Sequence, residues 1–224
     1  MRHSRFLLIL VLYASVACAS KPPAPGGQGV PPAAAQQAPQ QTNRPLAGFA
    51  AQRLIVLPTR FLRTNDSLGW TRDIGAAADY LKTVDDELAF ALRERGVQGT
   101  WVMASDVVKA AKRNFAYATD PYTLGEEPLR PPRKKPELLA DPLASELRNL
   151  IALHDGVRYA LLPVEVRFEK FGSQGRAVLH LAVIDVRMSK VLWSGDVVSD
   201  PSILFTPALA ASLSVHVADM IASP

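Results

Sequence analysis

The chain has 224 residues, a net charge of +4 and a single cysteine, which is about one and a half domains at ~150 residues per domain. Apolar residues make up 48% of it, enough to bury a core, which excludes a fully disordered chain. One cysteine excludes an internal disulfide framework and a cysteine-rich zinc site. The positive charge would suit a nucleic-acid-binding protein, so the position of the charges along the chain has to decide.

Residues 1–17 have the pattern of an export signal. Arg2 and Arg5 precede an apolar run that begins at Phe6, and small residues follow it. The run from Phe6 to Ala17 is 12 residues long, whereas a membrane-spanning helix needs about 20. The sequence therefore predicts a signal peptide over residues 1–17.

The only cysteine, Cys18, lies where such a signal would be cleaved. Val16-Ala17-Cys18 resembles the lipobox of bacterial lipoproteins, with Ser15 where that pattern prefers Leu. The resemblance implies a lipid acyl chain on Cys18, and Ala19 after it implies sorting to the outer membrane. The alternative is ordinary cleavage after Ala17-Cys18-Ala19, an A-x-A site that would give a soluble periplasmic or secreted protein.

Residues 18–46 contain Cys18 and a predicted tether. Within it, the 25 residues from Lys21 to Pro45 include 7 Pro, 5 Gln, 5 Ala and 3 Gly, a composition typical of an extended linker. Two basic residues belong to the signal and two to the tether. The remaining 21 basic and all 21 acidic residues lie from Arg53 onward, so the predicted domain, residues 47–224, is neutral. Neutrality and export argue against a nucleic-acid partner.

The first half of the domain alternates short strands with helices. An apolar, β-branched run at residues 53–58 predicts a buried strand, and residues 100–102 predict a second. Residues 63–72 are polar and predict a loop that holds Trp70. Apolar residues at helical spacing predict a helix over residues 73–95 that ends at Gly96, and another over residues 105–115. A further helix begins at Asp141-Pro142.

The last third alternates at the period of a strand. Between residues 157 and 169, five apolar side chains are predicted to face one way: Ala160, Leu162, Val164, Val166 and Phe168. Glu165 and Arg167 are predicted to face the other way. Residues 176–187 and 191–198 predict two more strands, and the short turns between these strands predict that they pair as antiparallel neighbours. Residues 206–221 predict a final helix. The predicted order β-α-β-α-loop-α-β-β-β-α is an α/β (α+β) fold, a mixed, mainly antiparallel sheet with helices packed on it.

A Pro-rich, charged loop at residues 117–140 interrupts this pattern. Its basic residues are candidates for binding an anionic partner, and Trp70 is a candidate exposed contact. The alternative is a solvated loop whose charges are balanced by nearby acids. The basic candidates are Arg130, Arg133, Lys134 and Lys135.

Residues with catalytic potential are few. His154 is followed by Asp155, a pair that could orient a general base, but no G-x-S-x-G motif accompanies it, so packing at a helix end is the favoured interpretation. We interpret His180 and His216 as structural and Asp85-Asp86-Glu87 as a solvated helix face. The sequence predicts no catalytic residue, no metal site and no cofactor. An envelope hydrolase using His154 and Asp155 is kept as an alternative.

The domain from about residue 53 to residue 222 resembles the N-terminal domain of TolB and the periplasmic domain of curli-secretion (CsgG-like) lipoproteins. The resemblance rests on Ile55–Pro58, on the leucines of the first helix before Gly96-Val97, and on Gly156–Leu161, Val183–Val186 and Val191–Gly195. The layout of lipid Cys, Pro-rich tether and small domain resembles a lipoprotein activator of peptidoglycan synthases.

These resemblances imply a non-catalytic lipoprotein of the outer membrane, acting as an adaptor for an envelope protein. Its partners would be membrane lipid, through acylated Cys18, and a protein of unknown identity. The alternative that the family offers is a subunit of a curli-type secretion channel.

Overall fold

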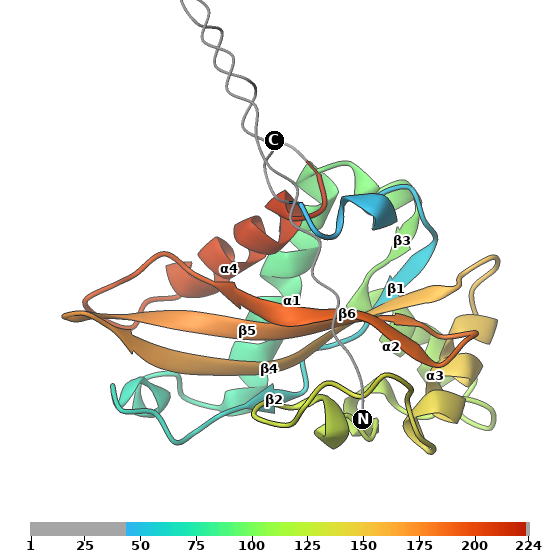
Figure 1. Cartoon of the computed structure of the whole chain (residues 1–224), viewed down its shortest axis with the longest axis horizontal. Helices are drawn as coiled ribbons and strands as arrows, with labels where there is room; N and C mark the ends of the chain where they lie inside the picture. The colour runs from blue at the N-terminus through green and yellow to red at the C-terminus, as the bar shows by residue number, and fades with distance from the viewer. Residues whose placement is uncertain (1–43, 223–224) are drawn as a thin grey trace, which may run out of the picture. The chain divides into compact units, whose positions relative to one another are not determined.

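The computed structural model describes residues 44–222, in which helices cover both faces of one twisted sheet (Figure 1). The predicted signal peptide, Cys18 and most of the tether lie outside the described residues. No helix of the described part is long and apolar enough to span a bilayer. The strands are β1 (Leu54–Val56), β2 (Phe61–Leu62), β3 (Trp101–Val102), β4 (Tyr159–Phe171), β5 (Gln174–Asp185) and β6 (Lys190–Val198), and the helices are α1 (Ala77–Glu94), α2 (Ala104–Arg113), α3 (Leu143–Ala152) and α4 (Ala208–Asp219).

The sheet has the strand order β3-β1-β4-β5-β6, and β2 pairs with the far half of β4. Pairs β1–β3, β1–β4 and β2–β4 are parallel, whereas the long pairs β4–β5 and β5–β6 are antiparallel. The predicted mixed α+β fold is therefore confirmed. Strand β2 was not predicted, because its two apolar residues stand between Arg60 and the polar stretch of residues 63–72, which indicates a loop.

One face of the sheet packs against α1 and α4, and we call it the α1–α4 face. Its core is wholly buried at Leu92 of α1 and at Leu213 and Val217 of α4. Gly96 ends the helical region after α1 in the left-handed conformation, with φ of 76°, as the sequence predicts. Leu46 also belongs to this core and its N–H bonds to the Met220 carbonyl at 3.2 Å. Leu46 thus packs in this core one residue before the predicted start of the domain.

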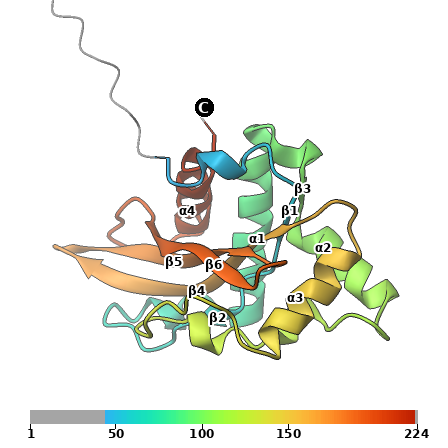
Figure 2. The same cartoon turned by 45° about the vertical axis from the view of Figure 1, so that its right-hand side comes forward.

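The opposite face, the α2–α3 face, is covered by α2, α3 and the segment of residues 118–142 (Figure 2). Leu124 and Leu129 of this segment pack in the same core as Leu147 and Leu150 of α3. Short 3-10 turns at residues 121–123 and 127–129 give the segment local structure. The loop predicted at residues 117–140 is therefore a covering layer of the domain.

A β-bulge in β4 overturns one prediction. Pro163 pairs with Leu181 and Glu165 with His180, so Val164 is an extra residue on β4. Ala160, Leu162 and Val164 face the α2–α3 core as predicted, but beyond the bulge the phase reverses. Val166 and Phe168 therefore join the α1–α4 core. The prediction that all five share one face was wrong, because strict alternation cannot register an added residue.

Candidate functional site

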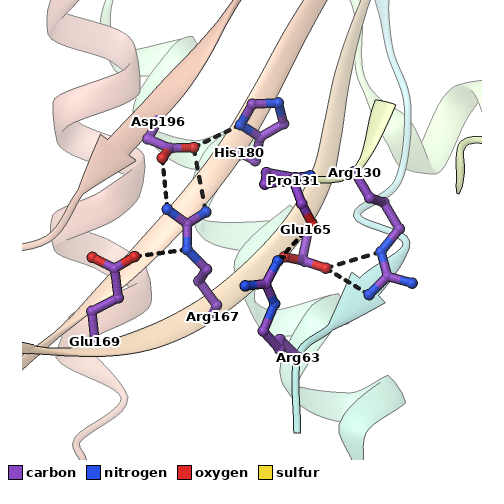
Figure 3. A network of polar contacts seen from close by, with 8 residues as sticks. All are labelled: Arg63, Arg130, Pro131, Glu165, Arg167, Glu169, His180 and Asp196. Carbon is purple, nitrogen blue, oxygen red and sulfur yellow. Dashed lines mark hydrogen bonds and ion pairs between the residues drawn. The ribbon is translucent and has the colours of Figure 1, made fainter. Parts of the chain in front are cut away.

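Glu165 is a carboxylate buried beneath the segment of residues 118–142. Its side chain has 0% exposure and receives two hydrogen bonds from Arg130, whose Nε and Nη2 lie 2.9 and 2.6 Å from Oε2 (Figure 3). Arg63, which follows β2, forms an ion pair with Oε1 at 2.5 Å. A buried carboxylate is stable only when it is paired and hydrogen-bonded, and two arginines from separate segments supply that pairing here.

The same arginines tie the covering segment to the sheet. Arg63 Nη2 donates to the Pro131 carbonyl oxygen at 2.9 Å, and the Arg130 guanidinium lies 4.2 Å from the centre of the Phe61 ring. The segment is therefore held at residues 130–131 by charge-assisted hydrogen bonds and a cation–π contact. We call Glu165, Arg63 and Arg130 the Glu165 clamp.

A second polar group lies beside the clamp on the same face. Arg167 donates to Glu169 at 2.8 Å and to both oxygens of Asp196 at 3.3 and 2.6 Å (Figure 3). His180 Nδ1 lies 2.6 Å from the Asp196 carboxylate, and its Nε2 lies 2.9 Å from Ser194 Oγ. The hydrogen bond with His180, together with Arg167, lowers the pKa of Asp196 well below its ordinary value.

Ser194, His180 and Asp196 follow the order of a nucleophilic triad, and sequence reasoning missed them because they come from two strands. Arg167 binds the same carboxylate that would orient the histidine, so the negative charge of Asp196 is shared between the two. His180 and Asp196 are also directly opposed residues of the β5–β6 ladder. This geometry is that of a cross-strand polar row that ties β4, β5 and β6 together.

The structure separates the four basic candidates. Arg130 is part of the Glu165 clamp, so it is not the free surface cation that the sequence analysis expected. Arg133, Lys134 and Lys135 follow it as exposed residues, and none of the three forms an ion pair within residues 44–222. We call these three residues the basic tip.

Trp70 is buried, which corrects the prediction of an exposed contact residue. It has 6% exposure, and its ring packs against Phe168 at a centroid distance of 5.7 Å. The prediction of exposure rested on the polar residues beside Trp70 in the sequence. Asp66 accepts hydrogen bonds from the N–H groups of Leu68 and Trp70, which folds the polar loop over the ring.

His154 and Asp155 lie at the end of α3 and line a cavity of about 370 Å³ with Arg53, Thr100 and Trp101. Burial lowers the pKa of His154, and its Nε2 has no hydrogen-bond partner within residues 44–222. The Asp155 backbone carbonyl accepts a hydrogen bond from Arg53 at 2.7 Å. The residues that line this cavity include no Ser or Glu among those described, and no described group of three or more His, Cys, Asp or Glu residues could hold a metal ion.

Two further acids are buried near the end of β1. Asp85 of α1 accepts hydrogen bonds from the Thr59 N–H at 2.8 Å and the Thr59 hydroxyl at 2.6 Å, and burial raises its pKa to about 6. Burial also raises the pKa of Glu126 well above its ordinary value. The prediction that Asp85 belongs to a solvated face was wrong, because Asp85 shares the inward stripe of α1 with Leu88 and Leu92.

No family model matches the chain, and no curated protein matches it. Among solved structures it is similar to the C-terminal domain of LpoB from Salmonella enterica, with 17% identity, a TM-score of 0.38 and coverage of 70% of this chain and 93% of that chain. The PelC dodecamer from Paraburkholderia phytofirmans has 14% identity, a TM-score of 0.38, and coverage of 78% and 91%. LpoB from E. coli has 16% identity, a TM-score of 0.36, and coverage of 83% and 84%. At these TM-scores the similarity assigns no family to the chain.

Proposed function

We propose that this chain is a non-catalytic, lipid-anchored adaptor on the periplasmic face of a bacterial outer membrane. Cys18 carries the lipid, residues 18–46 form the tether, and the domain binds a protein of an envelope assembly. The assembly is of the peptidoglycan-synthase-activator or secretion-accessory kind that the layout of the sequence resembles.

The observation that carries the proposal is the basic tip on a fixed segment. Glu165 is buried and holds Arg130 in place, and three cations that form no ion pair within residues 44–222 follow within five residues. A fixed set of exposed cations loses less conformational freedom on binding than a mobile one, which favours recognition of an acidic surface. Leu124 and Leu129 of the same segment are buried, which favours an adaptor over a channel subunit that would have to insert this segment in a membrane.

Crosslinking in cells tests the adaptor role. A photo-crosslinking amino acid at Lys134 should capture an envelope protein, and one at Arg93, an exposed residue in the last turn of α1, should not. Reversing the tip with Arg133→Glu, Lys134→Glu and Lys135→Glu should reduce capture by about tenfold or more. Equal capture at Lys134 and Arg93, or capture unchanged by charge reversal, would remove the basic tip from the proposal.

Labelling with a fatty-acid analogue tests the anchor separately. The chain should incorporate the label, and Cys18→Ala should abolish it. Incorporation of the label by the variant would show that the lipid is elsewhere, and absence of label from both chains would support ordinary cleavage after Ala19.

A further inference from the structure

Strand β6 lies at the end of the sheet and has β5 as its only strand neighbour in the described part of the chain. Residues 137–139 cover the first part of its outer edge. The Leu139 N–H bonds to the Ser189 carbonyl at 2.7 Å, and the Val191 N–H bonds to the Glu137 carbonyl at 3.0 Å. Within residues 44–222, no other backbone group reaches the outer edge of β6 between residues 192 and 197. The cover therefore stops after one bridge.

The hydrogen-bond pattern identifies which backbone groups point outward. The Ser199 N–H bonds to the Ala177 carbonyl at the start of β5, so residue 199 points toward β5. Direction alternates along an antiparallel strand, so Val198, Asp196 and Ser194 point away from β5. The Val198 carbonyl confirms this direction, because it lies 2.6 Å from His216 Nδ1 of α4. The N–H and C=O groups of Ser194 and Asp196 thus form a short row at the sheet edge.

The side chains at the start of this edge are apolar and basic, and the acidic side chain of Asp196 farther along it is paired with Arg167 and His180. Leu138, Met188 and Leu192 are exposed at 61%, 64% and 39%, and they gather where residues 137–139 meet the start of β6. Arg187 is exposed and forms no side-chain hydrogen bond or ion pair within residues 44–222. Lys190 is exposed and has one distant partner, Glu137 at 3.9 Å. A protein normally covers or charges a sheet edge. Here the basic residues and the exposed apolar side chains both lie at the start of β6, next to the uncovered part of the edge.

We propose that the outer edge of β6 binds an extended segment of the partner protein, one that carries apolar and acidic side chains and adds a strand to the sheet. This inference rests on the proposed adaptor function. Backbone hydrogen bonds to Ser194 and Asp196 would supply part of the affinity. Contacts with Leu138, Met188 and Leu192, and pairing of acidic side chains with Arg187 and Lys190, would select the segment.

The tether of this chain is a poor competitor for the same edge. Seven of the 25 residues from Lys21 to Pro45 are proline, which has no N–H to donate to a neighbouring strand. The segment also has no acidic residue to meet Arg187 and Lys190. A partner segment that has acidic residues and few prolines fits the edge better on both counts.

Amide hydrogen exchange tests the proposal directly. Every buried side chain of the two cores lies between residues 46 and 221, so a chain of residues 19–224 keeps the whole fold. The probes are a short peptide of alternating Val and Glu and a matched peptide of alternating Val and Lys. The Val–Glu peptide should slow exchange at Ser194 and Asp196 by about tenfold or more. Gly195 and Val197, which already bond to β5, should change little.

Charge variants then test the selection. Arg187→Glu with Lys190→Glu should weaken binding of the Val–Glu peptide by about tenfold or more, and Lys82→Glu, a matched reversal on α1, should leave it unchanged. Three results would overturn the proposal: no slowing at Ser194 and Asp196, equal binding of both peptides, or protection of these two amides before any peptide is added.

A crosslinker at Leu192 separates this inference from the adaptor function. Capture of the same envelope protein at Leu192 and at Lys134 would support both. Capture at Lys134 without capture at Leu192 would leave the adaptor function standing and overturn the added strand.

Discussion

Both faces of the sheet bury an apolar core, but each adds a different kind of interaction to it. On the α1–α4 face, Phe168 lies at the centre of an aromatic cluster, with ring centroids of Trp70, Phe205 and Tyr80 at 5.7, 5.8 and 5.9 Å. On the α2–α3 face, the same strand presents Glu165 and Arg167, which form ion pairs with the side chains of Arg130 and Asp196. Apolar burial is non-directional, whereas a buried carboxylate accepts only correctly placed donors. The α1–α4 face therefore adds aromatic packing to its apolar core, and the α2–α3 face adds ion pairs that fix the position of a surface segment.

The largest effect on stability is expected on the α1–α4 face. Phe168→Ala should lower the free energy of unfolding by about 3–5 kcal/mol, because it removes a buried ring and leaves a cavity among its neighbours. Denaturant unfolding of the purified domain measures this. The control is Phe171→Ala at the exposed end of the same strand, where Phe171 is 52% exposed and the cost should stay below about 1 kcal/mol. A similar loss of stability at the two positions would contradict the difference between the buried core and the exposed end of the strand.

Asp85 is a buried ionisable residue on the inward stripe of α1, and it makes the stability of the fold depend on pH. Its pKa is about 6 in the folded protein against a reference value of 3.8, so between pH 4 and 6 the folded state binds more protons than the unfolded state. This contribution to stability is therefore lost as the pH rises. Asp85→Asn keeps an acceptor for Thr59 and stays neutral, so its advantage over the natural chain should grow by about 2–3 kcal/mol between pH 4 and pH 7.

The comparison of the two chains is needed because His154, whose pKa is lowered, contributes in the opposite direction over part of this range. Unfolding at several pH values gives the measurement. Asp86→Asn is the matched control, since the Asp86 side chain is 63% exposed and pairs with Lys82 at the surface of α1. Equal pH slopes for the natural chain and Asp85→Asn would show that Asp85 is ionised at no cost in the fold.

The Glu165 clamp should give a smaller loss of stability and a larger local change. Glu165→Gln weakens the hydrogen bonds to Arg130 and leaves two arginines without a counter-charge, at a cost of about 1.5–3 kcal/mol. Residues 118–142 should then become sensitive to limited proteolysis, while the helices of the α1–α4 face stay protected. Glu169→Gln is the control, because its side chain is 36% exposed. Cleavage throughout the chain, and not first in this segment, would contradict the separate roles of the two faces.

Much of the fold could be predicted from the sequence, because periodicity reports burial. The four helices were recognised from apolar stripes and from the stop at Gly96, and the long strands from their alternation. Strand β2 and the bulge at Val164 could not be found in this way. The two residues of β2 stand between Arg60 and a polar stretch, and the bulge is visible only against the register of β5.

Less of the candidate site could be predicted. The basic segment was recognised by its charges, but the separate role of Arg130 depends on Glu165, which is 35 residues away in the chain. Trp70 was expected at the surface because its sequence neighbours are polar, yet its contacts are with Phe168 and Phe205. Local composition describes the neighbours in sequence, whereas burial and ion pairing depend on neighbours in space.

The β-bulge in β4 also affects how this chain can be aligned with others. Val164 is the residue at which the inward face of the strand changes phase. A related chain without this extra residue would align with the first half of β4 in one frame and with the second half in another. Without a gap at residue 164, Glu165 would be matched to a core position and Phe168 to a polar one. A single-residue gap should therefore be allowed inside this strand, although insertions are usually expected in loops.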